Sequence, residues 1–184
     1  MRSTLTALAL MALATPAIAA PAAWTVVPAA SSIGFSGSQA GTAFTGKFGQ
    51  WTGQIAFDPA DLAHSSARIT ILTASGKTGD GMKDTSLGQA DWFDPEHFPR
   101  ATFVTTKIAA AGPGRYVADG VLTIKGKAVP VKLPFTLAIA GNTATMKGAT
   151  NVDRLAFGMG ATSDPSGQWV SKQIGLTIAV TAKK

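Results

Sequence analysis

Apolar and polar residues alternate with a period of two along most of the chain, which is the pattern of β-strands with one buried face. All odd positions from Val129 to Ile139 are apolar, and the segment from Ile174 to Val180 repeats this alternation. Turn-forming pairs such as Lys125-Gly126 separate the alternating segments. Strands are predicted near residues 24–27, 31–40, 44–57, 66–73, 100–108, 116–124, 127–139, 143–154 and 171–181.

The alternation changes phase between Phe44 and Phe57. Phe44 and Phe48 occupy even positions, whereas Trp51 and Phe57 occupy odd ones. One extra residue near Gly49 would return them all to a single face, as a β-bulge does. Because bulges bend strands strongly, this segment is typical of a sheet that curls into a barrel.

Pro130 and Pro134 share the face opposite the apolar residues of their strand. A proline has no N–H group to donate to a β-ladder. The strand over residues 127–139 is therefore expected to be exposed or bulged on its N–H side near these two prolines.

Residues 77–99 do not follow the strand pattern. Asp80 is a plausible N-cap for a short helix over residues 82–87, and Gly88 is a plausible C-terminal stop. Asp94 can cap a further turn. The sequence therefore predicts a short helical insertion in an all-β protein.

Within the insertion, residues 91–99 (DWFDPEHFP) combine three acids and one of the chain's two histidines with three large aromatics. Asp94, Glu96 and His97 lack the spacing of a His-Glu-x-x-His zinc motif, and no second histidine lies nearby in sequence. We favour a capped turn whose aromatics face an apolar interior while its charges face water, and we predict no metal site.

The usual motifs of nucleophilic catalysis are missing, since the chain has no Cys and no Gly-x-Ser-x-Gly elbow. An enzyme that acts on an apolar or isoprenoid substrate is an alternative. Its candidates for general acid/base work would be Asp84, Asp91, Glu96, His97 and Arg154.

The first 19 residues have the three parts of a secretory signal peptide. Arg2 supplies the positive charge, Leu5 to Leu13 is a short apolar run, and Ala17-Ile18-Ala19 is a cleavage signal. We expect residues 1–19 to be removed, residues 20–184 to form one domain, and the mature protein to be soluble in a bacterial periplasm.

Charged residues make up only 14% of the chain, and the formal charge is +6, or +5 once Arg2 is removed. The typical charged fraction is about 25%, so this composition suits an all-β protein better than a helical one. For an exported protein, anionic lipid headgroups are a more natural counterpart of the basic excess than nucleic acid. We therefore expect no nucleic-acid partner, and we expect transient contact with an anionic membrane surface.

The aromatic content indicates a function for the interior of the barrel. The chain has nine Phe and four Trp but a single Tyr. An eight-stranded antiparallel barrel can enclose a small ligand in an interior lined by such side chains. An outer-membrane barrel is disfavoured, because its aromatic girdles fit poorly with one Tyr.

A series of short motifs runs through nearly the whole mature chain. They are Trp24-Thr25-Val26, Ser31-Ser32-Ile33-Gly34-Phe35, Gly46-Lys47-Phe48, Ile55-Ala56-Phe57-Asp58-Pro59, Asp84-x-x-Leu87, Trp92-Phe93-Asp94, Phe98-Pro99-x-Ala101-Thr102-Phe103, Gly120-x-Leu122-Thr123-Ile124-Lys125-Gly126, Pro130-Val131 and Arg154-x-x-Phe157-Gly158. In this order and spacing the chain resembles the YceI-like proteins, a family of secreted bacterial proteins.

The resemblance implies a single antiparallel, eight-stranded, lipocalin-like barrel, partly closed by the helical insertion. It also implies a bound isoprenoid lipid, such as a polyprenol, a polyprenyl phosphate or a ubiquinone-type quinone, and no catalytic residue or catalytic cofactor. One position departs from the family. Many relatives carry His before the leucine that matches Leu87, whereas this chain has Ser86.

The expected function is that of a periplasmic carrier that holds an isoprenoid lipid or quinone in an apolar tunnel. A ligand-free structural β-protein is a further alternative, and the oligomeric state stays open, with a dimer as one option. The residues expected to line the tunnel are Phe35, Phe48, Phe57, Ile71, Leu87, Trp92, Phe93, Phe103, Leu122, Phe135 and Phe157.

Overall fold

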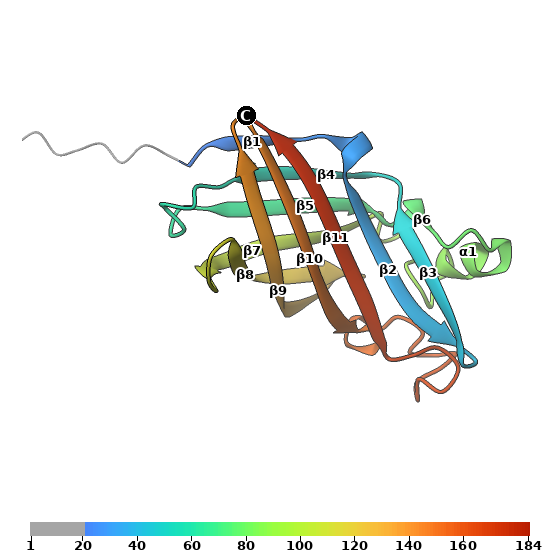
Figure 1. Cartoon of the computed structure of the whole chain (residues 1–184). Helices are drawn as coiled ribbons and strands as arrows, with labels where there is room; N and C mark the ends of the chain where they lie inside the picture. The colour runs from blue at the N-terminus through green and yellow to red at the C-terminus, as the bar shows by residue number, and fades with distance from the viewer. Residues whose placement is uncertain (1–20) are drawn as a thin grey trace, which may run out of the picture.

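Each alternating segment of the sequence forms an antiparallel strand in the computed structural model, which describes residues 21–184 (Figure 1). The strands are β1 (Ala23–Val26), β2 (Ser32–Gln39), β3 (Thr42–Phe48), β4 (Trp51–Ala56), β5 (Ser66–Leu72), β6 (Gly76–Lys77), β7 (Arg100–Ala110), β8 (Arg115–Ile124), β9 (Lys127–Ala140), β10 (Thr143–Asp153) and β11 (Gln173–Lys183). The helical elements are α1 (Gly81–Leu87) and three 3₁₀ turns, η1 (Pro28–Ala30), η2 (Thr73–Ser75) and η3 (Arg154–Phe157).

The strands close into a ring because β1 pairs on one side with β4 and on the other with β11. Between these two strands the ladder runs β4-β5-β7-β8-β9-β10-β11. β2 pairs with the same edge of β11 as β1 does, farther along that strand, so β1 and β2 follow one another on one side of the wall. β3 then pairs with β2. The predicted all-β fold, an eight-stranded antiparallel barrel with a short helical insertion, is confirmed.

The bulge predicted near Gly49 within one strand over residues 44–57 is wrong, because the chain there forms two strands, β3 and β4, with a break between them. Phe48 ends one strand and Trp51 begins the next, and both side chains line the barrel interior. Gly49 and Gln50 still pair with the neighbouring chain, because the Gly49 N–H donates to the Ser75 carbonyl at 3.1 Å. The strands that pair with β4 and β3 are β5 and β6, and η2 separates them at the same level of the barrel. The wall formed by β3 and β4 and the wall formed by β5 and β6 therefore bend together. β6 has only two residues, and no sequence pattern predicted it.

The two prolines of β9 lie where that strand has a single neighbour. The β9–β10 ladder extends only as far as the pair Phe135–Gly148, whereas Pro130 and Pro134 pair with β8. Their missing N–H groups therefore break no ladder, which confirms the expectation of an open N–H side.

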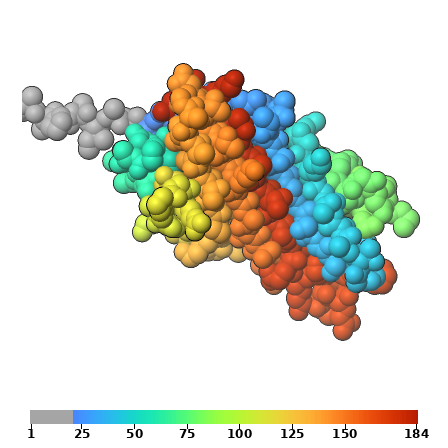
Figure 2. Space-filling view, in the orientation of Figure 1, coloured from blue at the N-terminus to red at the C-terminus, as the bar shows by residue number. Residues whose placement is uncertain are grey.

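The insertion begins with the predicted capped helix. The Asp80 side chain accepts hydrogen bonds from the first backbone N–H groups of α1, and Gly88 ends the helix. A second turn follows at Asp94, whose carbonyl accepts the Phe98 N–H at 2.7 Å. Asp94 itself adopts φ 49°, so the segment after it forms a tight turn without a helix. The insertion projects from the end of the barrel opposite the C-terminus (Figures 1 and 2).

Two apolar clusters fill the barrel, one toward each end. The cluster at the insertion end surrounds Phe157, which is 1% exposed. The cluster at the opposite end surrounds Trp24, whose indole N–H donates to the Phe57 carbonyl at 2.9 Å. The Lys184 ammonium lies 4.6 Å from the Trp24 ring centroid and covers that end.

Among residues 21–184, no helix is long and apolar enough to cross a membrane. The predicted signal peptide, residues 1–19, and its cleavage site lie outside the described residues. Both stay predictions.

Candidate functional site

A long, narrow apolar cavity of about 240 Å³ lies inside the barrel. On β11 its lining residues follow one another at alternate positions from Ile174 to Ala182, which is about 27 Å along the strand at about 3.4 Å per residue. A strand tilt of about 40° leaves about 20 Å along the barrel axis. Among residues 21–184, the lining residues with a hydroxyl group or a charge are Ser66, Thr105, Thr150 and Arg154.

All eleven residues predicted to line the tunnel are part of this lining. They are Phe35, Phe48, Phe57, Ile71, Leu87, Trp92, Phe93, Phe103, Leu122, Phe135 and Phe157. They come from β2, β3, β5, β7, β8 and β9, from the residue that follows β4, from α1 and the turn after it, and from η3. Their contact with a ligand stays a prediction.

Other lining residues were not named from the sequence, among them Trp24, Ile33, Phe44 and Trp51. The period-two pattern placed such residues on apolar faces. Alternation alone does not say which face of a strand points inward, so it could not separate lining residues from outward ones. Closure of the strands into a ring decides which face of each strand points inward.

Two large rings lie against the barrel wall because glycines face them on neighbouring strands. A Cβ atom at Gly46 would fall 2.2 Å from the Phe35 ring, and one at Gly120 would fall 2.5 Å from the Phe103 ring. Each glycine thus provides space that its partner ring occupies. The rings stay close to the wall, which leaves the central space open.

The insertion covers one end of the cavity with aromatic side chains. The sequence predicted that all three aromatics of residues 91–99 face the interior, and two of them, Trp92 and Phe93, do so. Phe93 packs edge-on against Phe48 at a centroid distance of 5.6 Å, and Phe48 packs in turn against Phe35 at 5.2 Å. Trp92 lines the cavity beside them. Phe98 differs from the expectation, because it lies outside the cavity over the β8–β9 turn, close to Gly126.

Asp91 fastens the insertion to the segment that follows η3. Its carboxylate accepts the Thr162 N–H at 3.0 Å, the Ser163 N–H at 2.8 Å and the Ser163 hydroxyl at 2.6 Å. Partial burial would raise the pKa of Asp91, but the bonds from Ser163 and Thr162 outweigh it and lower the pKa to about 2. Asp91 is therefore a structural anchor and stays ionised near neutral pH.

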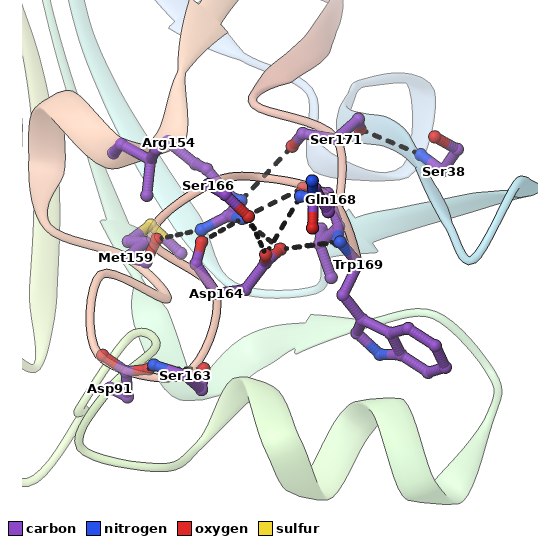
Figure 3. Close-up of polar contacts among 12 residues, drawn as sticks. Ser38, Asp91, Arg154, Met159, Ser163, Asp164, Ser166, Gln168, Trp169 and Ser171 are labelled. Carbon is purple, nitrogen blue, oxygen red and sulfur yellow. Dashed lines mark hydrogen bonds and ion pairs between the residues drawn. The ribbon is translucent and has the colours of Figure 1, made fainter.

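A buried ion pair organises the same end of the barrel (Figure 3). Arg154 is 2% exposed, and its Nη2 lies 2.6 Å from the Asp164 carboxylate. The guanidinium also donates to the carbonyls of Met159 and Val170, at 2.7 and 3.0 Å. Arg154 thus ties together a loop of more than ten residues, and the Trp169 side chain points away from this network (Figure 3).

The partners of Asp164 keep it charged. Its carboxylate accepts the N–H groups of Val170 and Trp169, at 2.7 and 3.2 Å. The Val170 bond, followed by the Trp169 bond and the charge of Arg154, holds the pKa of Asp164 below its ordinary value against the opposing effect of burial. The Asp164 carboxylate is therefore ionised and hydrogen-bonded.

Trp92 connects the buried pair to the cavity. The Arg154 guanidinium carbon lies 5.4 Å from the Trp92 ring centroid, which is a cation–π contact. Both residues line the cavity. The only charged group at the lining is thus covered by an aromatic ring and engaged with protein partners.

The structure does not gather the five acid/base candidates into one site. These are Asp84, Asp91, Glu96, His97 and Arg154. Asp84 accepts bonds from Thr78, and exposed His97 pairs with Asp94 at 2.8 Å, which raises the pKa of His97. Arg154 alone of the five lines the cavity. Nowhere in residues 21–184 do three His, Asp or Glu side chains cluster as a metal site would require.

Ser86, the position that departs from the expected family pattern, lies on the exposed face of α1. Its hydroxyl donates to the Met82 carbonyl one turn earlier, at 2.9 Å. Ser86 does not line the cavity.

Comparison with known proteins matches the chain to the YceI-like domain over residues 24–182. A UPF0312 protein of Vibrio cholerae is 30% identical over 176 residues, which cover 89% of this chain and 93% of that protein. A UPF0312 protein of Vibrio parahaemolyticus is 31% identical over 113 residues, which cover 61% of this chain and 60% of that protein.

Solved structures share the barrel. The crystal structure of Burkholderia cenocepacia BcnA is 36% identical with a TM-score of 0.81, covering 85% of this chain and 98% of that one. The Campylobacter jejuni YCEI protein is 27% identical with a TM-score of 0.69, covering 76% and 84%. A polyisoprenoid binding domain from Saccharophagus degradans is 14% identical with a TM-score of 0.67, covering 87% and 97%, and supports the fold alone. The chain belongs to the YceI-like family.

Proposed function

We propose that this protein is a periplasmic carrier that holds a long-chain isoprenoid lipid or an isoprenoid quinone inside its barrel. The observation that carries the proposal is the apolar cavity, with its nearly unbroken lining of aliphatic and aromatic side chains. The polyisoprenoid binding of the Saccharophagus degradans domain, which has the same fold, agrees with it. The periplasmic location rests on the leader sequence.

The length of the lining accommodates a long hydrocarbon chain. A bilayer core is about 30 Å thick, so one leaflet's chain spans about 15 Å. The lining extends about 20 Å along the axis, as estimated above from β11. About 20 Å of an extended chain can therefore be buried, which is longer than the depth of one leaflet.

Apolar burial alone provides enough free energy for binding. Each buried CH₂ contributes about 0.8 kcal/mol, so about fifteen buried carbons contribute about 12 kcal/mol before ordering costs. An engineered apolar cavity of about 150 Å³ in another protein stays dry and binds benzene. The cavity here is larger, at about 240 Å³, and its walls offer few polar groups that a water molecule could bridge.

The test is mass spectrometry of organic extracts from the mature protein, purified from its native periplasm without detergent. We expect a stoichiometric long-chain isoprenoid lipid or quinone. A repeated absence of any such lipid from a folded preparation would refute the proposal.

A substitution that obstructs the cavity with a larger side chain tests the same proposal. Ala118 is 4% exposed and pairs with Ile108 and Leu133, which both line the cavity. Ala118→Phe should obstruct the cavity, at a stability cost of about 1–3 kcal/mol, and reduce the chain length or the amount of bound lipid. Ala138→Phe, on the exposed face of β9, is the matched control and should leave both unchanged. Equal lipid content in the two variants would contradict the location.

A further inference from the structure

An open hollow of about 450 Å³ lies outside the cavity at the insertion end. Three segments form it: the turn before β7, the β8–β9 turn and the loop after η3. Its lining residues are Ala90, Asp91, Phe98, Lys125, Lys127, Phe157, Gly158, Ala161 and Thr162.

The hollow and the cavity share a single lining residue, Phe157. In each of the other two segments, one residue lines the cavity and its neighbour in the chain lines the hollow. Trp92 lines the cavity and Asp91 the hollow, and likewise Ile124 lines the cavity and Lys125 the hollow. The polarity of the wall therefore changes within one residue at these two segments. A continuous path here would be apolar inside and polar outside, which is the polarity of an amphiphile.

Two lysines give the hollow its donors. The Lys125 ammonium donates to the Ala90 carbonyl at 2.6 Å, which uses one of its three N–H groups. The Lys127 ammonium lies beside Gly158, where an added Cβ would be 2.9 Å from it. Lys127 takes part in none of the ion pairs between residues 21–184. Both ammonium groups therefore keep donors for a ligand.

The nearby carboxylates already have partners. Asp91, the only acid in the lining, accepts bonds from Thr162 and Ser163. Asp94 lies outside the lining and pairs first with His97, while the charge of Lys125 also lowers its pKa. The lining carries two cations and one carboxylate, a net charge of +1 (2 − 1).

We propose that this hollow binds the anionic head of the ligand, a phosphate or carboxylate group, through Lys125 and Lys127, while the chain occupies the cavity; Phe157, which is 1% exposed and separates the two spaces, must turn aside for the chain to pass. The proposal rests on the proposed function and adds the chemistry of the head to it. Ammonium groups form charge-assisted hydrogen bonds with such oxygens, and these are stronger than neutral ones. Inside the cavity the only charged side chain, Arg154, is occupied by Asp164 and Trp92.

The experiment uses two probes with the same chain, geranylgeranyl phosphate and geranylgeraniol, and the delipidated mature protein. Dissociation constants are measured by tryptophan fluorescence at low salt. We expect the phosphate to bind about tenfold more tightly than the alcohol, since even one charge-assisted bond can supply the about 1.4 kcal/mol that tenfold requires. In Lys125→Met/Lys127→Met the two constants should agree within about twofold.

The control is Lys132→Met/Lys147→Met, which removes the same charge from the outer barrel wall and should keep the preference. If the first double variant does not fold, Lys127→Met alone, at an exposed position, should halve the preference or more. Inorganic phosphate should bind at least a hundredfold more weakly than the lipid phosphate. Comparable binding would mean that a free anion is the ligand, and would overturn the proposal.

The remaining outcomes separate the two proposals. Equal affinity of the wild-type protein for alcohol and phosphate would overturn the head-group site and leave lipid binding intact. A preference that survives loss of Lys125 and Lys127 would also overturn the site. Binding of neither probe would overturn both the site and the proposed function.

Discussion

Replacing Trp92 with Ala tests whether the insertion belongs to the ligand site or only covers the end of the barrel. Trp92 is half-buried, lines the cavity and contacts Arg154 at 5.4 Å. A fully buried Trp→Ala change costs about 3–5 kcal/mol, and partial exposure places this one near the lower limit, about 3 kcal/mol, including about 1–2 kcal/mol for the cation–π contact. In a domain of this size that lowers the melting temperature by about 6–12 °C.

Ligand binding should weaken in the same variant. Loss of part of the indole surface from the lining should cost about 1.4 kcal/mol of binding free energy, which is about tenfold in the dissociation constant. Bound lipid per folded protein, by mass spectrometry, and the melting temperature are measured on one sample. Trp169→Ala is the matched control, because Trp169 is 59% exposed and outside the lining. It should change stability by less than about 0.5 kcal/mol and leave binding intact. A large fall in the melting temperature of Trp92→Ala with full lipid content would refute the assignment.

Two further predictions concern the insertion end. The pKa of Asp91 is about 2 in the folded state, against an ordinary value of 3.8. Its carboxylate should therefore contribute about 1–2 kcal/mol to the free energy of unfolding above about pH 4, after allowance for solvent screening. This contribution is lost as the pH falls through about 2. Asp91→Asn should remove that part of the acid dependence in urea unfolding followed from pH 5 to pH 2, and an unchanged profile would contradict it. Arg154→Met should cost about 3 kcal/mol, the lower end for a broken buried pair, since Asp164 keeps backbone donors; a cost below about 1 kcal/mol would show that the pair does not hold the loop.

Local patterns in the sequence were enough for most of the fold. Alternation predicted the positions of most long strands, and the phase change near Gly49 located the irregularity there, although the predicted bulge within one strand is a break between β3 and β4. Capping chemistry predicted α1, because Asp80 and Gly88 act on backbone groups only a few residues away. Such signals work because they depend on neighbours in the chain. β6 escaped prediction because a two-residue strand has no period.

The sequence by itself determined that the protein is an all-β barrel with apolar strand faces and an aromatic-rich insertion. Only the tertiary structure decided which faces point inward, since closure of β1 against β4 and β11 makes one face concave and buries it. It also decided which partners the acidic side chains of residues 91–99 have. Asp91 meets Thr162 and Ser163, more than seventy residues away, and no local pattern can specify a partner at that separation. The arrangement of Arg154, Asp164 and Trp92 around the cavity's end depends on the same long-range packing.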